Sequence, residues 1–198
     1  MDKRSGSTRQ IKDMKQLEAL ASPARQEIID TLEAGGPSSA AELGALLGRA
    51  PDSLYFHLKR LEDAGLVKRS DRDIGRGRTE AVFEPAGRDM RLAPEAFTPA
   101  KADAMARLTG AMMRITARDL ENAVVEGLAN VHGKRCNYRA GRMKAWLTGA
   151  QLQDINSHID AIMEIMRTGE RPKGSALHAM TFAMAPVAPS ERATTDPP

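Results

Sequence analysis

The chain has 198 residues, of which 41% are hydrophobic and 28% charged, as in an ordinary globular protein. Its formal net charge is +3 and its pI is near 9.2, which permits a polyanionic partner without requiring one. Its single cysteine, Cys136, excludes an intrachain disulfide framework, and every apolar run is shorter than the roughly 18 residues that a membrane span needs. We therefore expect a cytoplasmic protein with no signal peptide and no membrane partner.

Two helices are predicted near the start of the chain, after a polar N-terminus, residues 1–10, that we expect to be disordered. From Ile11 the apolar residues recur at helical spacing. Ser22 and Pro23 are residues typical of a helix start, and they predict a second helix that ends at the "GGP" of residues 35–37.

Two further helices and a hairpin follow. Ser39 and Glu42 have the spacing of a capping box, and the helix "AAELGALL" that they begin is expected to end at Gly48. The next helix covers residues 51–64 and stops at Gly65. Small Gly44 and turn-forming Gly48 let these two helices approach closely, so we predict a helix-turn-helix. The strands "LVKRS" and "TEAVFEP" around the loop "DRDIGRGR" form its wing.

The C-terminal half is predicted to be mainly helical. Beyond a linker at residues 91–98, Thr98 and Pro99 begin a long helix that we expect to reach about His132. Its apolar stripe is too long for so small a domain to cover, so we expect a partner helix from a second copy of the chain. The stripe comprises Met105, Leu108, Met112, Ile115, Leu120, Val124, Leu128 and Val131.

A last helix and a strand complete the region of residues 99–187, which we interpret as a dimerisation and possible effector region. Thr148 and Gln151 form a second capping box, and the helix that they begin carries an apolar face. The run "ALHAMTFAMAPV" favours an apolar strand, and the Pro- and Thr-rich tail, residues 188–198, is expected to be disordered.

The helix at residues 51–64 has two chemically different faces. On a helical wheel Leu54, Leu58 and Leu61 form the core face. The other positions combine hydroxyl, aromatic, acidic and cationic groups, which suits base edges and phosphates in a major groove, although an amphipathic helix with a solvated face has the same pattern. We expect Tyr55 to bind a phosphate. Phe56 packs either on a thymine methyl or against a neighbouring helix, and we favour the helix.

The basic surplus of the chain lies in this region. Residues 57–78 hold seven Lys or Arg against four acids. Arg76 and Arg78, in the Gly-rich loop, are candidates for a narrow minor groove or for phosphates, or they form a solvated tip without a ligand.

The segment of residues 132–144 has five cations and no acid. It is either a solvated loop, a site for an anionic effector, or a source of additional phosphate contacts; the candidate residues are Lys134, Arg135, Arg139 and Arg142. His132 and Cys136 are four apart, but two ligands without a third predict no metal site. A redox role for Cys136 is an alternative. We expect no cofactor, and no enzyme signature is present.

Two segments resemble a known family. "ALASPARQEIIDTL" and "AAELGALLGRAPDSLYFHLKRLEDAGLVKR" resemble the winged helix-turn-helix domain of ArsR-like bacterial transcription regulators, over about residues 14–86. The resemblance implies a mainly α fold with a small β wing, a recognition helix at 51–64 and a wing at 66–84. It also implies a homodimer on a palindromic operator. The Cys-x-Cys pair of the metal-sensing members is absent, so metal sensing of that kind is not expected.

The sequence thus predicts a homodimeric, sequence-specific DNA-binding transcription regulator, with residues 11–90 as the DNA-binding domain. A small-molecule effector is possible at the C-terminal region. The alternative is a protein-interaction module on the same scaffold, whose binding would depend far less on salt than DNA binding does. The predicted DNA contacts are Ser39, Asp52, Ser53, Tyr55, Phe56, Lys59, Arg60, Arg76 and Arg78.

Overall fold

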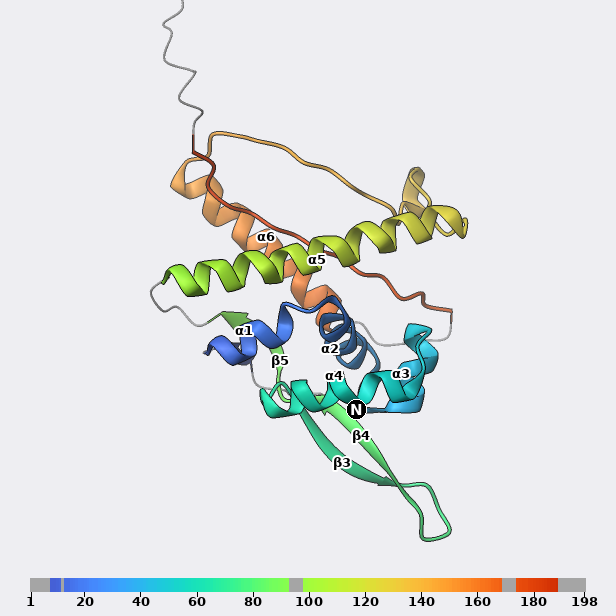
Figure 1. Cartoon of the computed structure of the whole chain (residues 1–198). Helices are drawn as coiled ribbons and strands as arrows, with labels where there is room; N and C mark the ends of the chain where they lie inside the picture. The colour runs from blue at the N-terminus through green and yellow to red at the C-terminus, as the bar shows by residue number, and fades with distance from the viewer. Residues whose placement is uncertain (1–7, 12, 93–97, 169–173, 189–198) are drawn as a thin grey trace, which may run out of the picture.

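The computed structural model describes residues 8–11, 13–92, 98–168 and 174–188 (Figure 1). Four helices form a body from which a β hairpin projects, and two longer helices follow. The elements are β1 (Thr8–Ile11), α1 (Met14–Leu20), α2 (Pro23–Gly35), β2 (Ser38–Ser39), α3 (Ala40–Leu47), α4 (Pro51–Asp63), β3 (Val67–Asp73), β4 (Thr79–Pro85), β5 (Arg88–Leu92), α5 (Pro99–Val125), the 3₁₀ turn η1 (Gly133–Arg135) and α6 (Gly149–Thr168).

The predicted starts of α3, α5 and α6 are confirmed by capping hydrogen bonds, whereas α2 begins at the predicted Ser22–Pro23 without a side-chain cap from Ser22. The Ser39 hydroxyl accepts the Glu42 N–H at 3.3 Å, and the Glu42 carboxylate accepts the Ser39 N–H at 2.7 Å. The Thr148 hydroxyl accepts the Gln151 N–H at 3.3 Å, and the Gln151 carbonyl oxygen accepts the Thr148 N–H at 2.9 Å. Thr98 caps α5. Side-chain caps of this kind satisfy backbone donors that a helix leaves free at its start.

The core lies between α1, α2, α3 and α4, and α5 covers it on the side away from the hairpin (Figure 1). The three leucines predicted for the core, Leu54, Leu58 and Leu61, are completely buried. Ala104 and Leu108 of α5 join the same cluster. Burial of each large aliphatic side chain contributes about 1.5–3 kcal/mol, so these contacts hold α4 to the body and leave its opposite face outside.

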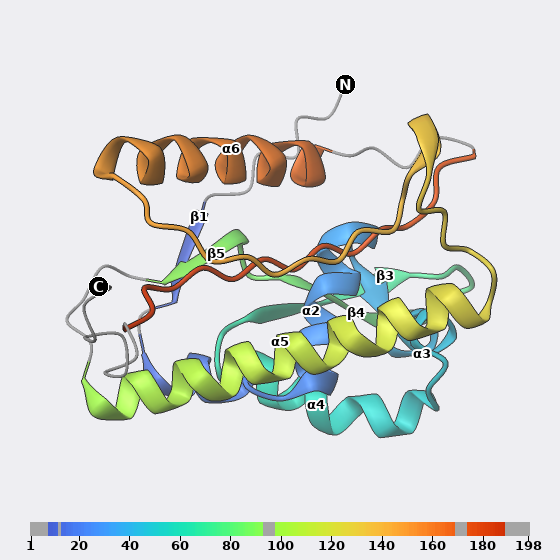
Figure 2. The same ribbon diagram turned by 90° about the horizontal axis from the view of Figure 1, so that it is seen from above.

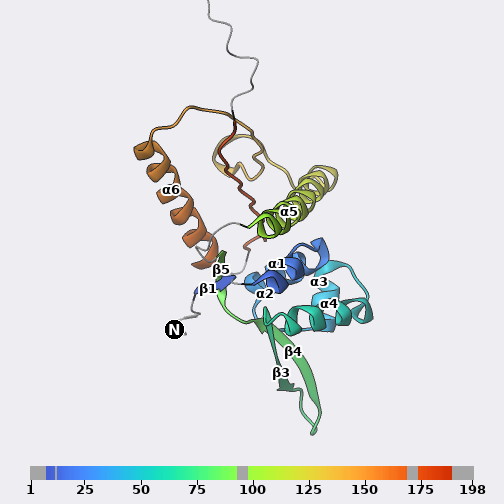
Figure 3. The same ribbon diagram turned by 60° about the vertical axis from the view of Figure 1, so that its left-hand side comes forward.

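The hairpin confirms the predicted wing. β3 and β4 pair antiparallel from Val67↔Pro85 to Asp73↔Thr79, and the short β2 adds to β4, giving the strand order β2-β4-β3. The hairpin projects from the body beside α4 (Figures 1 and 3). The protein therefore has a winged helix-turn-helix fold, mainly α with a small β wing.

Both ends of the predicted DNA-binding domain differ from expectation. β1 pairs in parallel with β5, so Thr8–Gln10 are not disordered and Arg91–Leu92 are not linker. Ile11 belongs to β1, and α1 begins only after Asp13, whose carboxylate accepts the Gln16 N–H at 2.8 Å. Strands this short and polar show no clear hydrophobic periodicity in the sequence, because each becomes a strand only by pairing with the other. The rest of the N-terminus, residues 93–97 of the linker and residues 189–198 of the tail lie outside the described residues.

The C-terminal half differs in two places. α5 ends at Val125 and not near His132, because Gly127 adopts a left-handed conformation (φ 69°) and the Leu128 N–H turns back to the Ala123 carbonyl at 2.9 Å. Residues 174–188 are extended, but within the described chain they join no sheet, so the predicted strand is wrong. No helix among the described residues is long and apolar enough to cross a membrane.

Candidate nucleic-acid interface

A tight turn joins α3 to α4. The Arg49 N–H donates to the Gly44 carbonyl at 2.9 Å, and Gly48 adopts the predicted left-handed conformation with φ 63°. A Cβ atom on Gly44 would lie 2.6 Å from the Arg49 carbonyl oxygen. Only glycine therefore allows the turn to come this close to α3, which fixes the angle at which α4 leaves the body.

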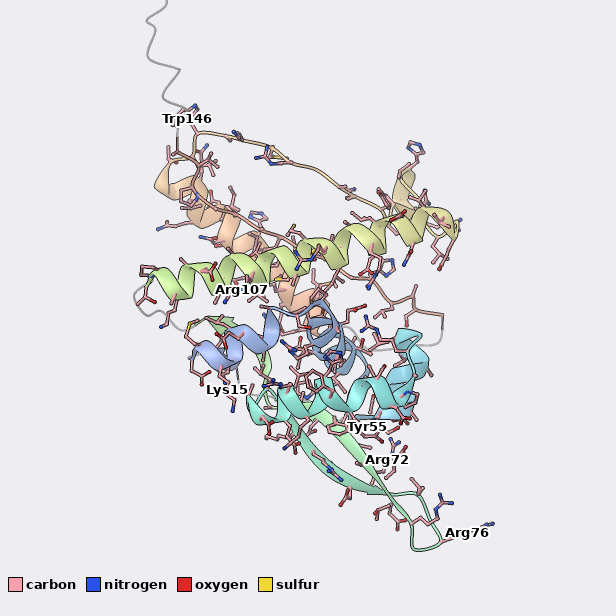
Figure 4. All side chains as sticks on the ribbon, in the orientation of Figure 1. Lys15, Tyr55, Arg72, Arg76, Arg107 and Trp146 are labelled. Carbon is pink, nitrogen blue, oxygen red and sulfur yellow. The ribbon has the colours of Figure 1, made fainter. Side chains whose placement is uncertain are left out.

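The outward face of α4 is open to solvent. Tyr55 and Phe56 are 52% and 61% exposed; Phe56 lies on the side of the helix opposite the buried leucines, and Tyr55 about a quarter-turn from Leu54. Asp52, Lys59 and Arg60 are exposed as well. In Figure 4, Tyr55, Arg72 and Arg76 follow one another from α4 to the tip of the wing. The helix and the hairpin thus present polar, aromatic and cationic groups on one side of the molecule.

Phe56 does not pack against a neighbouring helix, so that preference was wrong. Its ring lies under the guanidinium group of Arg60, with 5.5 Å from the Arg60 Cζ atom to the ring centroid. The edge of His57 approaches the same ring at a centroid distance of 5.6 Å. A cation above an exposed aromatic ring contributes about 0.5–1 kcal/mol, so the pair is held loosely and stays available to a ligand.

Lys59 is paired within its own helix. Its ammonium group lies 2.8 Å from an Asp63 carboxylate oxygen and 3.8 Å from a Glu62 oxygen. The hydrogen bond with Asp63 raises the pKa of Lys59 and lowers the pKa of Asp63. Because both side chains are exposed, the pair is weak, and a phosphate can compete for the lysine.

Two of the predicted serine contacts are engaged by the fold. Ser39 is buried and its hydroxyl belongs to the capping box of α3, so the structure does not bring it to the outward face. Ser53 is exposed in the first turn of α4, and its hydroxyl donates to the Ala50 carbonyl at 2.7 Å.

The wing tip is a tight loop. Gly75, Arg76 and Gly77 all have positive φ (86°, 57° and 68°), and the Asp73 carboxylate accepts the Gly75 N–H at 2.7 Å. The Ile74 N–H donates to the Arg78 carbonyl at 3.0 Å and closes the loop. The flanking glycines allow this course at no steric cost, whereas Arg76 adopts a conformation that is rare for a residue with a side chain. The exposed side chains of Arg76 and Arg78 thus lie at the end of the hairpin.

Sequence reasoning missed Arg72, which ties the wing to α3. Its guanidinium donates to Glu42 at 2.8 Å and to Glu80 at 3.0 Å. Glu80 is the cross-strand partner of Arg72 in the β3–β4 register. The opposite charges of these two residues in the predicted hairpin were the signal that could have identified the role of Arg72. The pKa of Glu42 is lowered, first by the Ser39 N–H and then by Arg72.

A second missed residue, Glu27 of α2, accepts hydrogen bonds from two arginines. Arg49, in the turn before α4, and Arg118, in α5, each lie 2.6 Å from one of its carboxylate oxygens. The bond to Glu27 is the main reason that the pKa of Arg118 is raised. A single carboxylate thereby joins α2, the helix-turn-helix turn and α5.

His57 faces the body rather than the outward side. Its Nδ1 atom is buried without a hydrogen-bond partner among the described residues. Loss of solvation, followed by the charges of Arg25 and Arg49, lowers the pKa of His57. The ring is therefore neutral at neutral pH and adds no charge to the interface.

The basic segment of residues 132–144 is exposed. Lys134 and Arg135 lie in η1, and Arg139 and Arg142 lie on the extended stretch that follows. Cys136 is half-buried, with its Sγ atom 3.6 Å from the Tyr138 carbonyl oxygen. In the described part of the chain no three His, Cys, Asp or Glu side chains are grouped as metal ligands.

Comparison with known families matches the region just described. Residues 20–70 match the family model of a helix-turn-helix domain. Over these residues the structure has the helix-turn-helix arrangement that the match describes. Such domains bind DNA in transcription regulators, with the second helix in the major groove. No curated protein matches the chain.

Solved structures that resemble the chain are distant. The transcriptional regulator PA4135 is 16% identical over 71% of this chain and 78% of its own, with a TM-score of 0.31. The transcriptional regulator Tm0710 from Thermotoga maritima is 15% identical over 79% and 91%, with a TM-score of 0.30. A MarR-family transcriptional regulator from Silicibacter pomeroyi is 17% identical over 80% and 87%, with a TM-score of 0.29.

Proposed function

We propose that this protein is a sequence-specific DNA-binding transcription regulator of the ArsR-like winged-helix type, acting as a homodimer. The observation that carries the proposal is the common outward direction of α4 and the wing: three buried leucines fix the helix, and its aromatic and cationic residues lie on the same side as the arginine loop (Figure 4). A surface of this composition suits a polyanion with readable base edges.

In this proposal α4 lies in the major groove, which is about 12 Å wide and admits one helix. Tyr55 binds a phosphate through its hydroxyl, and Lys59 exchanges Asp63 for a phosphate. Arg60 and Phe56, already stacked, face the bases: the guanidinium suits guanine, and the ring suits a thymine methyl. Asp52 and Ser53 lie in the first turn of α4, within reach of base amino groups.

The wing contacts the DNA beside the helix. Arg76 and Arg78 extend from the end of the hairpin, where a narrow minor groove has its most negative potential. Arg72, in contrast, is neutralised by two carboxylates, so we assign it to holding the wing in place and not to the DNA.

We assign a separate role to each of the two predicted domains. Residues 11–90 bind DNA, and residues 99–187 dimerise the chain, as a two-fold operator requires. An effector acts at the C-terminal region, where Lys134, Arg135, Arg139 and Arg142 suit an anion. Such an effector changes DNA affinity only if it prefers one dimer geometry to the other. The single cysteine and the absence of disulfides agree with a cytoplasmic regulator.

The test is selection of bound duplexes from a random library at low ionic strength. We expect a palindromic consensus with half-sites about one helical turn apart, and affinity that falls steeply as salt rises. Failure to enrich any sequence with the protein folded would overturn the proposal. Binding of a protein partner with little salt dependence would instead support the interaction-module alternative.

A further inference from the structure

Among the described residues, α6 has no extensive contact with another helix or strand. Its apolar residues recur at helical spacing and form one face, on which Leu152, Ile162 and Met166 are 40–46% exposed and Ile155 and Ile159 are half-buried. In the part of the chain that the structure describes, no helix or strand packs along α6, and Figures 2 and 3 show it standing apart from α5. The apolar face comprises Leu152, Ile155, Ile159, Ile162 and Met166. In proteins most of a helix's stability comes from tertiary packing of its apolar face, so the apolar face of this 20-residue helix requires a cover.

Two extended segments beside α6 are uncovered as well. Residues 139–148 lead into α6 and residues 174–188 follow it, and both run between α6 and α5 in Figure 2. Trp146 is 91% exposed and Leu177 is 81% exposed. Residues 174–188 do touch α5, where the Thr116 hydroxyl donates to the Thr181 hydroxyl oxygen at 2.6 Å. This contact orients the segment but buries little apolar surface.

The solvent-accessible area of the chain is larger than that of a compact monomer of the same mass. A compact monomer of 21.5 kDa exposes about 9,200 Å², whereas this chain exposes 14943 Å². If every residue outside the described part is counted as fully extended, at about 1.45 Å² per dalton, those residues account for about 4,400 Å² and an excess of about 1,400 Å² remains. Permanent homodimers bury about 2,000–5,000 Å² in total, or about 1,000–2,500 Å² from each chain, so one partner accounts for the excess.

We propose that a second copy of this chain covers these surfaces, with α6 and both extended segments packed on the same elements and on α5 of the partner. The inference rests on the proposed homodimer and names its surface. Val124 and Val125 at the end of α5 are also exposed and extend the apolar area. The charges are self-complementary: residues 132–144 carry five cations and no acid, and α6 carries Asp154, Asp160 and Glu164 against Arg167. In a dimer with two-fold symmetry, the basic segment of each chain can face the acidic α6 of the other, so the contact occurs twice.

The experiment measures the mass of the full chain by light scattering, together with fluorescence of its single tryptophan. We expect a dimer with a blue-shifted Trp146 emission that acrylamide quenches poorly. Ile162→Glu places a charge in the apolar face of α6 and should shift the protein toward monomer and expose Trp146. Gln153→Glu places the same charge on the opposite face and should leave both readouts unchanged.

A stable monomer at micromolar concentration would overturn the inference. So would a dimer in which Trp146 is fully quenched and Ile162→Glu changes neither mass nor emission, because the dimer would then use another surface. Retained helical circular dichroism in the variant shows that the winged domain is folded. No DNA enters this experiment, so a chain that dimerises as described but selects no duplex would refute the proposed function alone.

Discussion

Arg72 of the wing donates a 2.8 Å hydrogen bond to Glu42, the residue whose carboxylate also caps α3. The same guanidinium reaches Glu80 on the neighbouring strand. The first helix of the helix-turn-helix and the wing are therefore positioned by one shared carboxylate, although 30 residues separate the two partners.

Replacing Arg72 should loosen the wing with little effect on global stability. In Arg72→Ala we expect a loss of less than about 1 kcal/mol in unfolding free energy, because the pair is exposed. Hydrogen exchange of the wing amides should become faster and duplex affinity should fall. Arg107→Ala removes a comparable exposed pair, with Asp103 on α5, and should alter neither wing exchange nor affinity. Unchanged wing exchange in Arg72→Ala would refute the positioning role.

Lys59→Ala and Arg76→Ala should each weaken duplex binding, since one residue lies on the outward face of α4 and the other at the wing tip. Each loss of a phosphate contact should also reduce the slope of log affinity against log salt by about 0.9. Gel-shift titrations at several salt concentrations measure both effects, with Arg107→Ala as the control. If both variants bind as tightly as the parent, the contact map is wrong.

Gly44→Ala should destabilise the protein, because the new Cβ would lie 2.6 Å from the Arg49 carbonyl oxygen and force the turn apart. We expect a loss of about 1–3 kcal/mol in urea unfolding. Gly110→Ala is the matched control: it lies inside α5, where a Cβ meets only the flexible end of Arg114 at 3.3 Å. That variant should gain up to about 1 kcal/mol from helix propensity. Equal effects of the two substitutions would contradict the close approach at Gly44.

Glu27→Gln should lower the free energy of unfolding by more than the loss of a surface ion pair does. The substitution leaves Arg49 and Arg118 without their shared carboxylate, whose side chain is only 11% exposed. We expect a loss of about 2 kcal/mol, below the value for a fully buried pair because both arginines reach solvent. Asp103→Asn, at the exposed Arg107 pair, should cost under about 0.5 kcal/mol. A loss no larger in Glu27→Gln than in this control would refute the joining role of Glu27.

Asp30 should make stability depend on pH. Its pKa is raised to about 6, mainly by loss of solvation, which exceeds the opposing effect of the Gln26 hydrogen bond, and the carboxylates of Glu27 and Asp119 raise it further. A raised carboxyl pKa means that the folded state disfavours the charged form. The contribution of Asp30 to the free energy of unfolding is therefore fully present below the unfolded pKa near 4 and is lost as the pH rises to about 6.

Asp30→Asn should abolish this decline and raise stability at pH 7 by about 1 kcal/mol, a value discounted because the side chain reaches solvent. Urea unfolding between pH 4 and 7 measures the effect. Asp71→Asn, on the exposed wing, should keep the decline. If the loss of stability between pH 4 and 7 persists unchanged in Asp30→Asn, a group other than Asp30 causes it.

Most of the site could be predicted from the sequence where a signal spans only a few residues. The capping box at Ser39, the turn between Gly44 and Gly48, and the three leucines of α4 were all recognised, because caps, turns and helical periodicity depend on nearby residues. The hairpin was recognised in the same way. These features together determine the winged helix-turn-helix and the face of α4 that it presents.

Tertiary structure alone decided the features that join distant segments. The β1–β5 pairing, the bridge from Arg72 to Glu42 and the two hydrogen bonds of Glu27 connect residues from 22 to 91 positions apart. The fold also buried Ser39 and left Phe56 under Arg60 and open to solvent. A local pattern records which residues share a face, whereas the partner that covers a face or pairs with a charge depends on how the whole chain packs.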